Sequence, residues 1–138
     1  MLFCTSMKAV ILAAGEGKRM RPLTETTPKP MLEVLGKPLL LHIIHSLPKE
    51  IDEIILVTGH LQEQIKNYFG DTFEGRTIRY IEQKEKKGTG HALWLCKSFF
   101  KEGERFLVLY ADDLHSKKAI QKVLSHPLAI LVKEVPDP

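Results

Sequence analysis

The stretch Leu12-Ala13-Ala14-Gly15-Glu16-Gly17-Lys18-Arg19-Met20-Arg21-Pro22-Leu23 begins inside the apolar run 9–14. The apolar run predicts a buried strand, and the two glycines, one residue apart, end it. Glycine lets a ligand approach the main chain closely, and successive exposed N–H groups in such a turn form a concave anion site. Lys18, Arg19 and Arg21 add positive charge, and the Arg19 guanidinium can bind a phosphate through two parallel hydrogen bonds. The sequence therefore predicts a phosphate-binding loop directly after a central strand.

A second cationic segment, Pro28-Lys29-Pro30-Met31, follows the loop. Each proline has a fixed φ, and Pro30 disfavours a helical backbone at the residue before it. We therefore expect a stiff, extended Pro-Lys-Pro segment that directs the Lys29 ammonium group with little loss of entropy.

Two familiar glycine motifs do not fit the loop. A dinucleotide-binding fingerprint needs glycine at the position of Met20, and a P-loop needs glycine in place of Leu12 and Ser or Thr in place of Arg19. Taken alone, Gly15 and Gly17 are typical of a tight strand-to-helix turn. The identity of the loop therefore depends on the rest of the chain.

The composition is that of an ordinary soluble globular domain. The 138 residues, 43% hydrophobic and 27% charged, suit one domain over 1–138, with 1–6 as a loose extension. A net charge of +3 is too small for a nucleic-acid patch but suits small anionic substrates. No apolar run is as long as a membrane span, and 1–6 lack the basic flank of a signal peptide. Cys4 and Cys96 suggest no disulfide framework, so we expect a cytoplasmic protein without nucleic acid or membrane as partner.

Apolar strand patterns alternate with helical patterns along the whole chain. The predicted strands are 7–14, 53–58, 77–82, 106–110 and 128–133, and the predicted helices are 38–47, 61–69, 89–100 and 116–124, the last with Ser116 as cap. This alternation predicts an α/β protein with a mostly parallel sheet between two layers of helices, a Rossmann-like α/β/α sandwich. Ligands of such sheets bind beyond the carboxyl ends of the strands. The glycine loop, Gly59, Gln83 and Asp112 all fall at that edge.

Two acidic residues, Asp112 and Asp113, follow the predicted strand 106–110. Carboxylates at a strand end that face a cationic phosphate loop suit a Mg²⁺ ion bridging phosphate oxygens. Turn residues or a helix cap explain the pair equally well from this segment alone.

Gln83 and the segment Gly88-Thr89-Gly90-His91-Ala92-Leu93 form a second candidate region. A glutamine side chain offers a donor and an acceptor to the edge of a nucleotide base, Gly88 permits close approach, and Thr89 can cap the following helix. Without further context a plain loop and helix cap is the simpler interpretation. By the same reasoning a packed or capping histidine is the simpler interpretation of His91, with contact to a ligand as the alternative. Trp94 is interpreted as a core residue and 84–87 as a solvated loop.

The ordered segments LAAGEGKRMRPLT (12–24), TTPKPMLEVLGKPLL (26–40) and the Gln83…GTGHA region resemble the sugar-1-phosphate nucleotidyltransferases, which make nucleoside-diphosphate sugars. The resemblance runs from Met7 to the last residue. It implies the same Rossmann-like fold and a reaction of a nucleoside triphosphate with a sugar 1-phosphate, which releases pyrophosphate. The form GTGHA is most similar to N-acetylglucosamine-1-phosphate uridylyltransferases, which favours a uridine or thymidine nucleotide.

The resemblance also implies roles for individual residues. Arg19, Lys29 and Asp112 take the catalytic positions, with Mg²⁺ on Asp112; the nucleotide-binding positions are Leu12, Ala13, Ala14, Gly15, Gly17, Lys18, Gln83, Gly88 and Thr89. Ala111 departs from the family, which usually has glycine before the metal-binding aspartate.

Two further expectations follow from the resemblance. The runner-up function is a non-catalytic, nucleotide-sensing homologue of the same fold. The family usually continues well beyond a segment such as 134–138, so we expect a truncated sheet, weak nucleotidyl transfer and self-association into a homo-oligomer. The sequence does not define the sugar.

Overall fold

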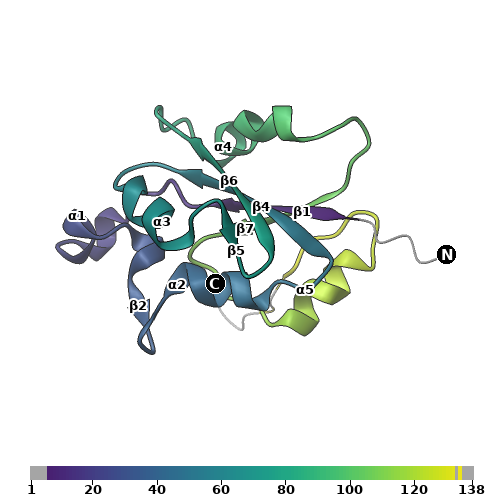
Figure 1. Cartoon of the computed structure of the whole chain (residues 1–138), viewed down its shortest axis with the longest axis horizontal. Coiled ribbons are helices and arrows are strands. Elements are labelled where there is room, and N and C mark those ends of the chain that lie inside the picture. The colour runs from purple at the N-terminus through teal and green to yellow at the C-terminus, as the bar shows by residue number, and fades with distance from the viewer. Residues whose placement is uncertain (1–5, 133, 135–138) are drawn as a thin grey trace.

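A five-stranded sheet forms the centre of the computed structural model, which describes residues 6–132 and 134 (Figure 1). The strands of this sheet are β1 (Met7–Leu12), β4 (Ile51–Thr58), β5 (Thr72–Phe73), β6 (Arg76–Glu82) and β7 (Phe106–Tyr110). The short strands β2 (Glu33–Val34) and β3 (Lys37–Pro38) pair with each other in a separate two-stranded sheet. The helices are α1 (Leu23–Thr26), α2 (Leu39–Ser46), α3 (Gln62–Phe69), α4 (Thr89–Leu95) and α5 (Lys117–Leu124), with short 3₁₀ helices η1 (Lys18–Met20), η2 (Lys29–Met31) and η3 (Cys96–Phe99).

The strand β1 lies in the interior of the sheet, whose order is β5-β6-β4-β1-β7. β1 pairs in parallel with β4 on one side and with β7 on the other, so that Ile11 lies opposite both Leu56 and Leu109. β6 continues the parallel sheet beyond β4, and only the short β5 runs antiparallel. The chain builds the sheet outward from β1 first through β4 and then through β7, so the strand order reverses at β1, where open α/β sheets bind ligands.

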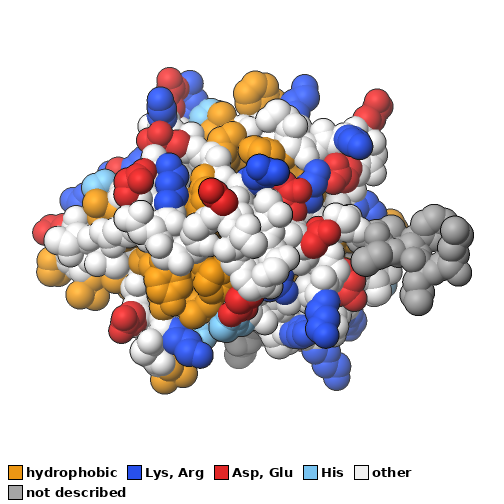
Figure 2. Space-filling model, in the orientation of Figure 1, with side chains coloured by type: hydrophobic (Ala, Val, Ile, Leu, Met, Phe, Trp, Pro, Cys, Tyr) orange, Lys and Arg blue, Asp and Glu red, His pale blue; other side chains and the backbone are white. Residues whose placement is uncertain are grey.

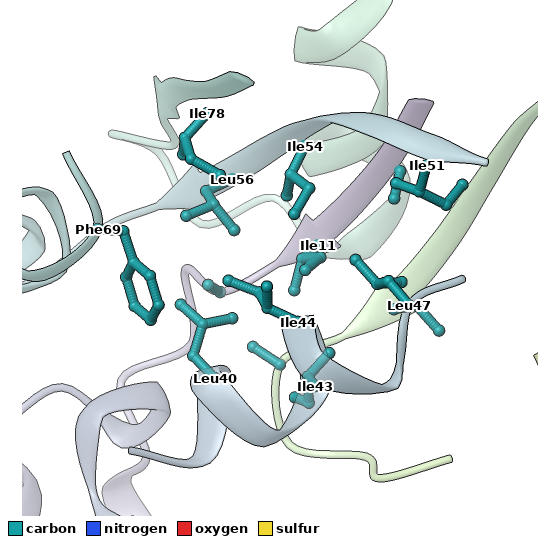
Figure 3. Packing of buried hydrophobic residues seen from close by; sticks show 14 of the residues in the cluster. Ile11, Leu40, Ile43, Ile44, Leu47, Ile51, Ile54, Leu56, Phe69 and Ile78 are labelled. Atoms are coloured by element: carbon teal, nitrogen blue, oxygen red, sulfur yellow. The ribbon is translucent and has the colours of Figure 1, made fainter. Parts of the chain in front are cut away.

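Side chains of β1 alternate between two apolar layers, because successive strand residues point to opposite faces. Ile11 packs with α2, α3 and α5 in the larger cluster shown in Figure 3, whereas Val10 packs with Ala92 and Cys96 of α4 and η3. Figure 1 shows α4 on one side of the sheet and α2 and α5 on the other. The predicted three-layer α/β/α sandwich is thus confirmed.

The predicted strand 128–133 is wrong over 128–132, and Lys133 lies outside the described residues. Leu128, Ile130 and Val132 are 93%, 84% and 81% exposed, and the segment forms no ladder with β7. An apolar pattern alone does not make a strand, because the backbone N–H and C=O groups also need a neighbouring strand.

Two smaller expectations also fail. The predicted helix 89–100 ends as α4 at Leu95 and continues only as η3. Trp94 is 67% exposed rather than in the core. On a helix, a residue two positions from both Ala92 and Cys96 faces away from the side that those two bury.

The remaining features concern the cysteines, the helices and the N-terminus. Cys96 is a free, fully buried thiol, and burial raises its pKa to about 11; Cys4 lies outside the described residues.

None of the helices in 6–132 has the length and apolar character needed to cross a membrane. Of the expected loose extension 1–6, only Ser6 is described, and its hydroxyl donates to Asp52 Oδ1 over 2.8 Å.

Candidate functional site

A pocket of about 700 Å³ lies beyond the carboxyl ends of the parallel strands. The chain reaches it four times: after β1, in the 3₁₀ helix η2, after β6 and after β7. Every residue to which the resemblance gave a role borders this pocket: Leu12, Ala13, Ala14, Gly15, Gly17, Lys18, Arg19, Lys29, Gln83, Gly88, Thr89 and Asp112. Arg21 and Gly59, which the sequence placed at the same edge, do not line it. Residues that come from distant parts of the sequence therefore meet in one place.

The loop after β1 is held to the sheet on one side and open on the other. Ala13 N donates to Val57 O over 2.8 Å. Gly59, after β4, packs so closely that an added Cβ would lie 2.9 Å from Ala14 O. Among the described residues, no group accepts a hydrogen bond from the backbone N–H groups of 15–19. These N–H groups remain as donors for an anion in the pocket.

Gly17 fixes the turn of the loop. Its φ of +61° is left-handed, and an added Cβ would lie 2.8 Å from Thr24 Cγ2 and 3.3 Å from Lys29 Cβ. The buried Thr24 hydroxyl donates to Gly17 O over 2.8 Å, and Met20 N donates to the same oxygen to begin η1. The glycine thus places the phosphate loop directly against the segment that carries Lys29.

Lys29 and Asp112 meet across the pocket. Lys29 Nζ lies 2.6 Å from Asp112 Oδ2, and both side chains remain partly exposed, at 27% and 48%. The expected extended backbone at Lys29 is wrong: Pro28 is extended, with ψ of 142°, and Lys29 begins η2. Pro30 is tolerated there because the first helical turn needs no N–H from it. The ion pair brings the predicted cationic segment to the predicted metal ligand.

An ion-pair cluster that the sequence did not reveal links the two walls of the pocket. The Glu16 carboxylate lies between the ammonium groups of Lys18, 3.3 Å away, and Lys86. Residues 84–87 are exposed, as expected for a solvated loop, and Lys86 of this loop also borders the pocket. Only the place of the loop between Gln83 and Gly88 could have suggested this second role.

The amide of Gln83 is fixed in the wall opposite the phosphate loop. Gln83 is only 7% exposed, and its backbone N donates to Thr58 O. Its side-chain Nε2 donates to Gly88 O over 3.0 Å and lies 3.1 Å from His91 Nδ1. The simpler interpretation of Gln83 as a plain loop residue therefore does not describe its surroundings.

The described residues that line the pocket offer few oxygen ligands for a metal ion. Among the described residues, no group of three or more His, Cys, Asp or Glu side chains is arranged to hold a metal. Asp112 borders the pocket, whereas Asp113 pairs with His115 Nε2 at 3.3 Å. Mg²⁺ commonly binds through one or two carboxylates together with substrate phosphates and water. Asp112 beside a phosphate loop fits that donor set.

The pocket therefore combines open N–H donors, the cations of Lys18, Arg19, Lys29 and Lys86, and one metal-competent carboxylate. It is suited to a polyphosphate, whose negative charge these groups neutralise. Beyond the phosphate loop, the Gln83 amide and the apolar Leu12 and Ala13 offer a surface for a flat, polar-edged group such as a base.

Comparison with known proteins gives consistent matches. A profile described as "Nucleotidyl transferase" matches residues 8–129. The bifunctional protein GlmU of Methanococcus maripaludis (strain C5) is 40% identical over 132 residues, which are 96% of this chain and 31% of GlmU. A D-glycero-alpha-D-manno-heptose 1-phosphate guanylyltransferase of Aneurinibacillus thermoaerophilus is 41% identical over 108 residues, 78% of this chain and 46% of that protein.

Solved structures also match the fold of this chain. A putative glucose-1-phosphate thymidylyltransferase from Bacillus anthracis superposes with a TM-score of 0.76 at 29% identity, over 86% of this chain and 50% of that one. UTP-bound UGPase from Acinetobacter baumannii superposes with a TM-score of 0.74 at 26% identity, over 86% and 53%. The chain thus spans about a third of the GlmU relative and about half of each solved structure.

Proposed function

The chain belongs to the nucleotidyl transferase family, and on that premise we propose that it acts on a nucleoside triphosphate and a sugar 1-phosphate to give a nucleoside-diphosphate sugar and pyrophosphate. The observation that supports this most directly is the meeting of Lys29 and Asp112 across a pocket whose other wall is an open phosphate loop. Relatives of two kinds, a uridylyltransferase of Haloferax volcanii and the heptose-phosphate guanylyltransferase, use different bases, so the family alone does not choose the nucleotide.

The proposed reaction needs no nucleophile from the protein. An ionised oxygen of the sugar phosphate attacks the α-phosphorus, and the bond from that phosphorus to the pyrophosphate oxygen breaks. The chain contributes position and positive charge. Arg19 and the N–H groups of the loop hold the departing β- and γ-phosphates, and Lys29 binds the α-phosphate region or the sugar phosphate.

Asp112 is the residue that would hold Mg²⁺ in this proposal. The donor set fits, because Mg²⁺ accepts one carboxylate with phosphate oxygens and water. A bound Mg²⁺ supplies charge that neutralises phosphate oxygens as the phosphorus–oxygen bonds change. Lys29 neutralises the same carboxylate, so a bound Mg²⁺ would share Asp112 with the Lys29 ammonium group or replace it.

The nucleoside lies against Leu12, Ala13, Gln83, Gly88 and Thr89 in this proposal. Gly88 has a φ of +89°, and an added Cβ there would meet no protein atom within 4 Å. That open space lets a base approach the backbone at the start of α4. We expect uridine or thymidine triphosphate to bind better than ATP or GTP.

Isotope exchange between pyrophosphate and each nucleoside triphosphate, with sugar 1-phosphates and Mg²⁺, tests the proposal. Asp112→Asn should lose most of the exchange because the metal loses a ligand charge, whereas the matched control Asp113→Asn should retain it. Binding of triphosphate without any exchange would support the non-catalytic, nucleotide-sensing alternative. Absence of both binding and exchange would refute the proposal.

We also propose that the protein is located in the cytoplasm, where nucleoside triphosphates are held.

We further propose that the chain self-associates. Among the described residues no strand pairs with the outer edge of β7, and Phe106, Val108 and Tyr110 are 38%, 37% and 49% exposed. An exposed apolar strand edge favours pairing with another chain. Figure 2 shows basic and acidic side chains interspersed on the face that it displays, without a field of one sign. Light scattering that finds a monomer at high concentration would refute the self-association.

A further inference from the structure

The hydrogen bonds of Gln83 determine which way its amide points. Gly88 O can only accept a hydrogen bond, so the side-chain atom 3.0 Å from it must be the amide nitrogen. The amide oxygen of Gln83 therefore lies on the other branch of the side chain.

His91 takes the second hydrogen of the same nitrogen. His91 Nδ1 lies 3.1 Å from Gln83 Nε2, and an amide nitrogen only donates. Nδ1 must then be the unprotonated, accepting nitrogen of a neutral imidazole, with the ring proton on Nε2. Both amide hydrogens of Gln83 are thus engaged by the protein, and none is left for a ligand.

The amide oxygen of Gln83 is the atom left for a ligand. No described residue donates to Oε1, and no fully buried side-chain oxygen or nitrogen of the described residues lacks a partner. Oε1 of this residue, which is only 7% exposed and borders the pocket, therefore keeps access to solvent. It presents a single acceptor of fixed direction.

We propose that His91 is a positioning residue that holds the Gln83 amide with its oxygen facing the ligand, so that the pocket selects bases carrying an imino N–H. Uracil and thymine at N3, and guanine at N1, present such a donor. Cytosine at N3 and adenine at N1 present a lone pair, which the fixed oxygen repels. The inference rests on the proposed function, because it assumes that a nucleotide base meets Gln83.

Asparagine and leucine at position 91 form a matched pair of substitutions. Both side chains branch at Cγ as histidine does, so Oδ1 of asparagine and Cδ1 of leucine each fall near the place of Nδ1. Asparagine keeps an acceptor for Gln83, whereas leucine removes it and leaves one hydrogen of a buried amide unpaired. Leucine is the better helix former, so lower stability of α4 cannot explain a defect confined to the leucine variant.

Calorimetric titration of the full chain with UTP and CTP, with Mg²⁺ present, tests the inference. The two bases have the same ring and differ in the protonation of N3 and the group at C4. We expect wild type and His91→Asn to prefer UTP, and the preference in His91→Leu to fall about ten-fold, which corresponds to about 1.4 kcal/mol. An unchanged preference in His91→Leu, or an equal fall in both variants, would overturn the role of His91.

The tautomer of His91 provides a test that needs no nucleotide. In ¹⁵N spectra of the wild-type chain at neutral pH, His91 should show an unprotonated Nδ1 and a protonated Nε2. The opposite tautomer would overturn the inference while leaving the proposed function intact. Failure of the wild-type chain to bind either triphosphate would instead refute the proposed function, and the base selection with it.

Discussion

Replacing Gly17 with alanine should destabilise the fold, whereas the same change at Gly15, two residues away, should not. Gly17 has a φ of +61°, and its added methyl group would lie 2.8 Å from Thr24 Cγ2. Gly15 does not have a left-handed φ, and its added methyl group would meet no protein atom within 4 Å. The two substitutions add the same atom to the same loop, so they separate backbone strain from general loop sensitivity.

The cost at Gly17 has two parts. A left-handed backbone costs a residue with a Cβ about 1–2 kcal/mol. The contact with Thr24 forces this buried side chain to turn, which breaks its 2.8 Å hydrogen bond to Gly17 O and costs about 1 kcal/mol more. The sum is about 2–3 kcal/mol. For a domain of this size that corresponds to a fall in Tm of roughly 6–12 °C.

Thermal and urea unfolding followed by circular dichroism measure both effects. Gly15→Ala should be neutral or slightly stabilising, by at most about 1 kcal/mol, because alanine restricts the unfolded chain. The same variant should bind triphosphate more weakly, since Gly15 borders the pocket. Equal losses of stability in the two variants, or no loss in Gly17→Ala, would contradict the structural role given to Gly17.

Three further predictions concern charge and pH. Arg19→Ala should raise the apparent KM for triphosphate, and for pyrophosphate in the reverse direction, by the loss of a charge-assisted contact of about 1.5–3 kcal/mol; unchanged triphosphate affinity by calorimetry would contradict this. Lys29→Ala should instead lower turnover with sugar phosphate. If the kinetic effects of Lys29→Ala and Arg19→Ala were indistinguishable, the two residues would not have the separate roles assigned to them. Burial and the charge of Asp71 raise the pKa of Tyr80 to about 12; the unfolded tyrosine therefore loses its proton first, and stability should fall as pH rises from 10 to 12. Because the ring is partly exposed, the fall should be at most about 1 kcal/mol, and it should be absent in Tyr80→Phe when urea unfolding is followed at each pH.

The sequence predicted the parts of the fold that depend on periodicity. β1, β4, β6 and β7 appear close to their expected positions, and the helix cap at Ser116 forms as expected, with its hydroxyl accepting from Ala119 N. Because parallel strands share a carboxyl edge, the approximate strand positions were sufficient to bring the glycine loop, Gln83 and Asp112 together. The place of Lys29, in η2, does not follow from the strand positions.

The parts that the sequence could not predict depend on contacts between loops. The pairing of Glu16 with Lys86 joins residues whose separation carries no pattern, and a charged loop gives no sign of which ammonium group turns inward. The orientation of the Gln83 amide depends on Gly88 O and His91 together, which only three-dimensional geometry reveals. Lys29 was assigned the wrong backbone because a local rule about the residue before proline was overridden by the 3₁₀ turn.

β7 is the last strand of the sheet in the sequence, and this determines the order in which the parts of the pocket can assemble. β1, β4 and β6 pair with one another in the order in which they occur along the chain. By contrast, β1 pairs with the distant β7, where Lys8 lies opposite Phe106, and Lys29 contacts Asp112, which lies 83 residues later in the sequence. Contacts between near segments generally form before distant ones, because closing a long loop costs more entropy. During synthesis the phosphate loop can therefore form on a nascent sheet that still lacks Asp112. We expect a folding chain to become able to hold phosphate before it can hold Mg²⁺, so that the metal dependence of nucleotide binding reports the docking of β7 onto β1.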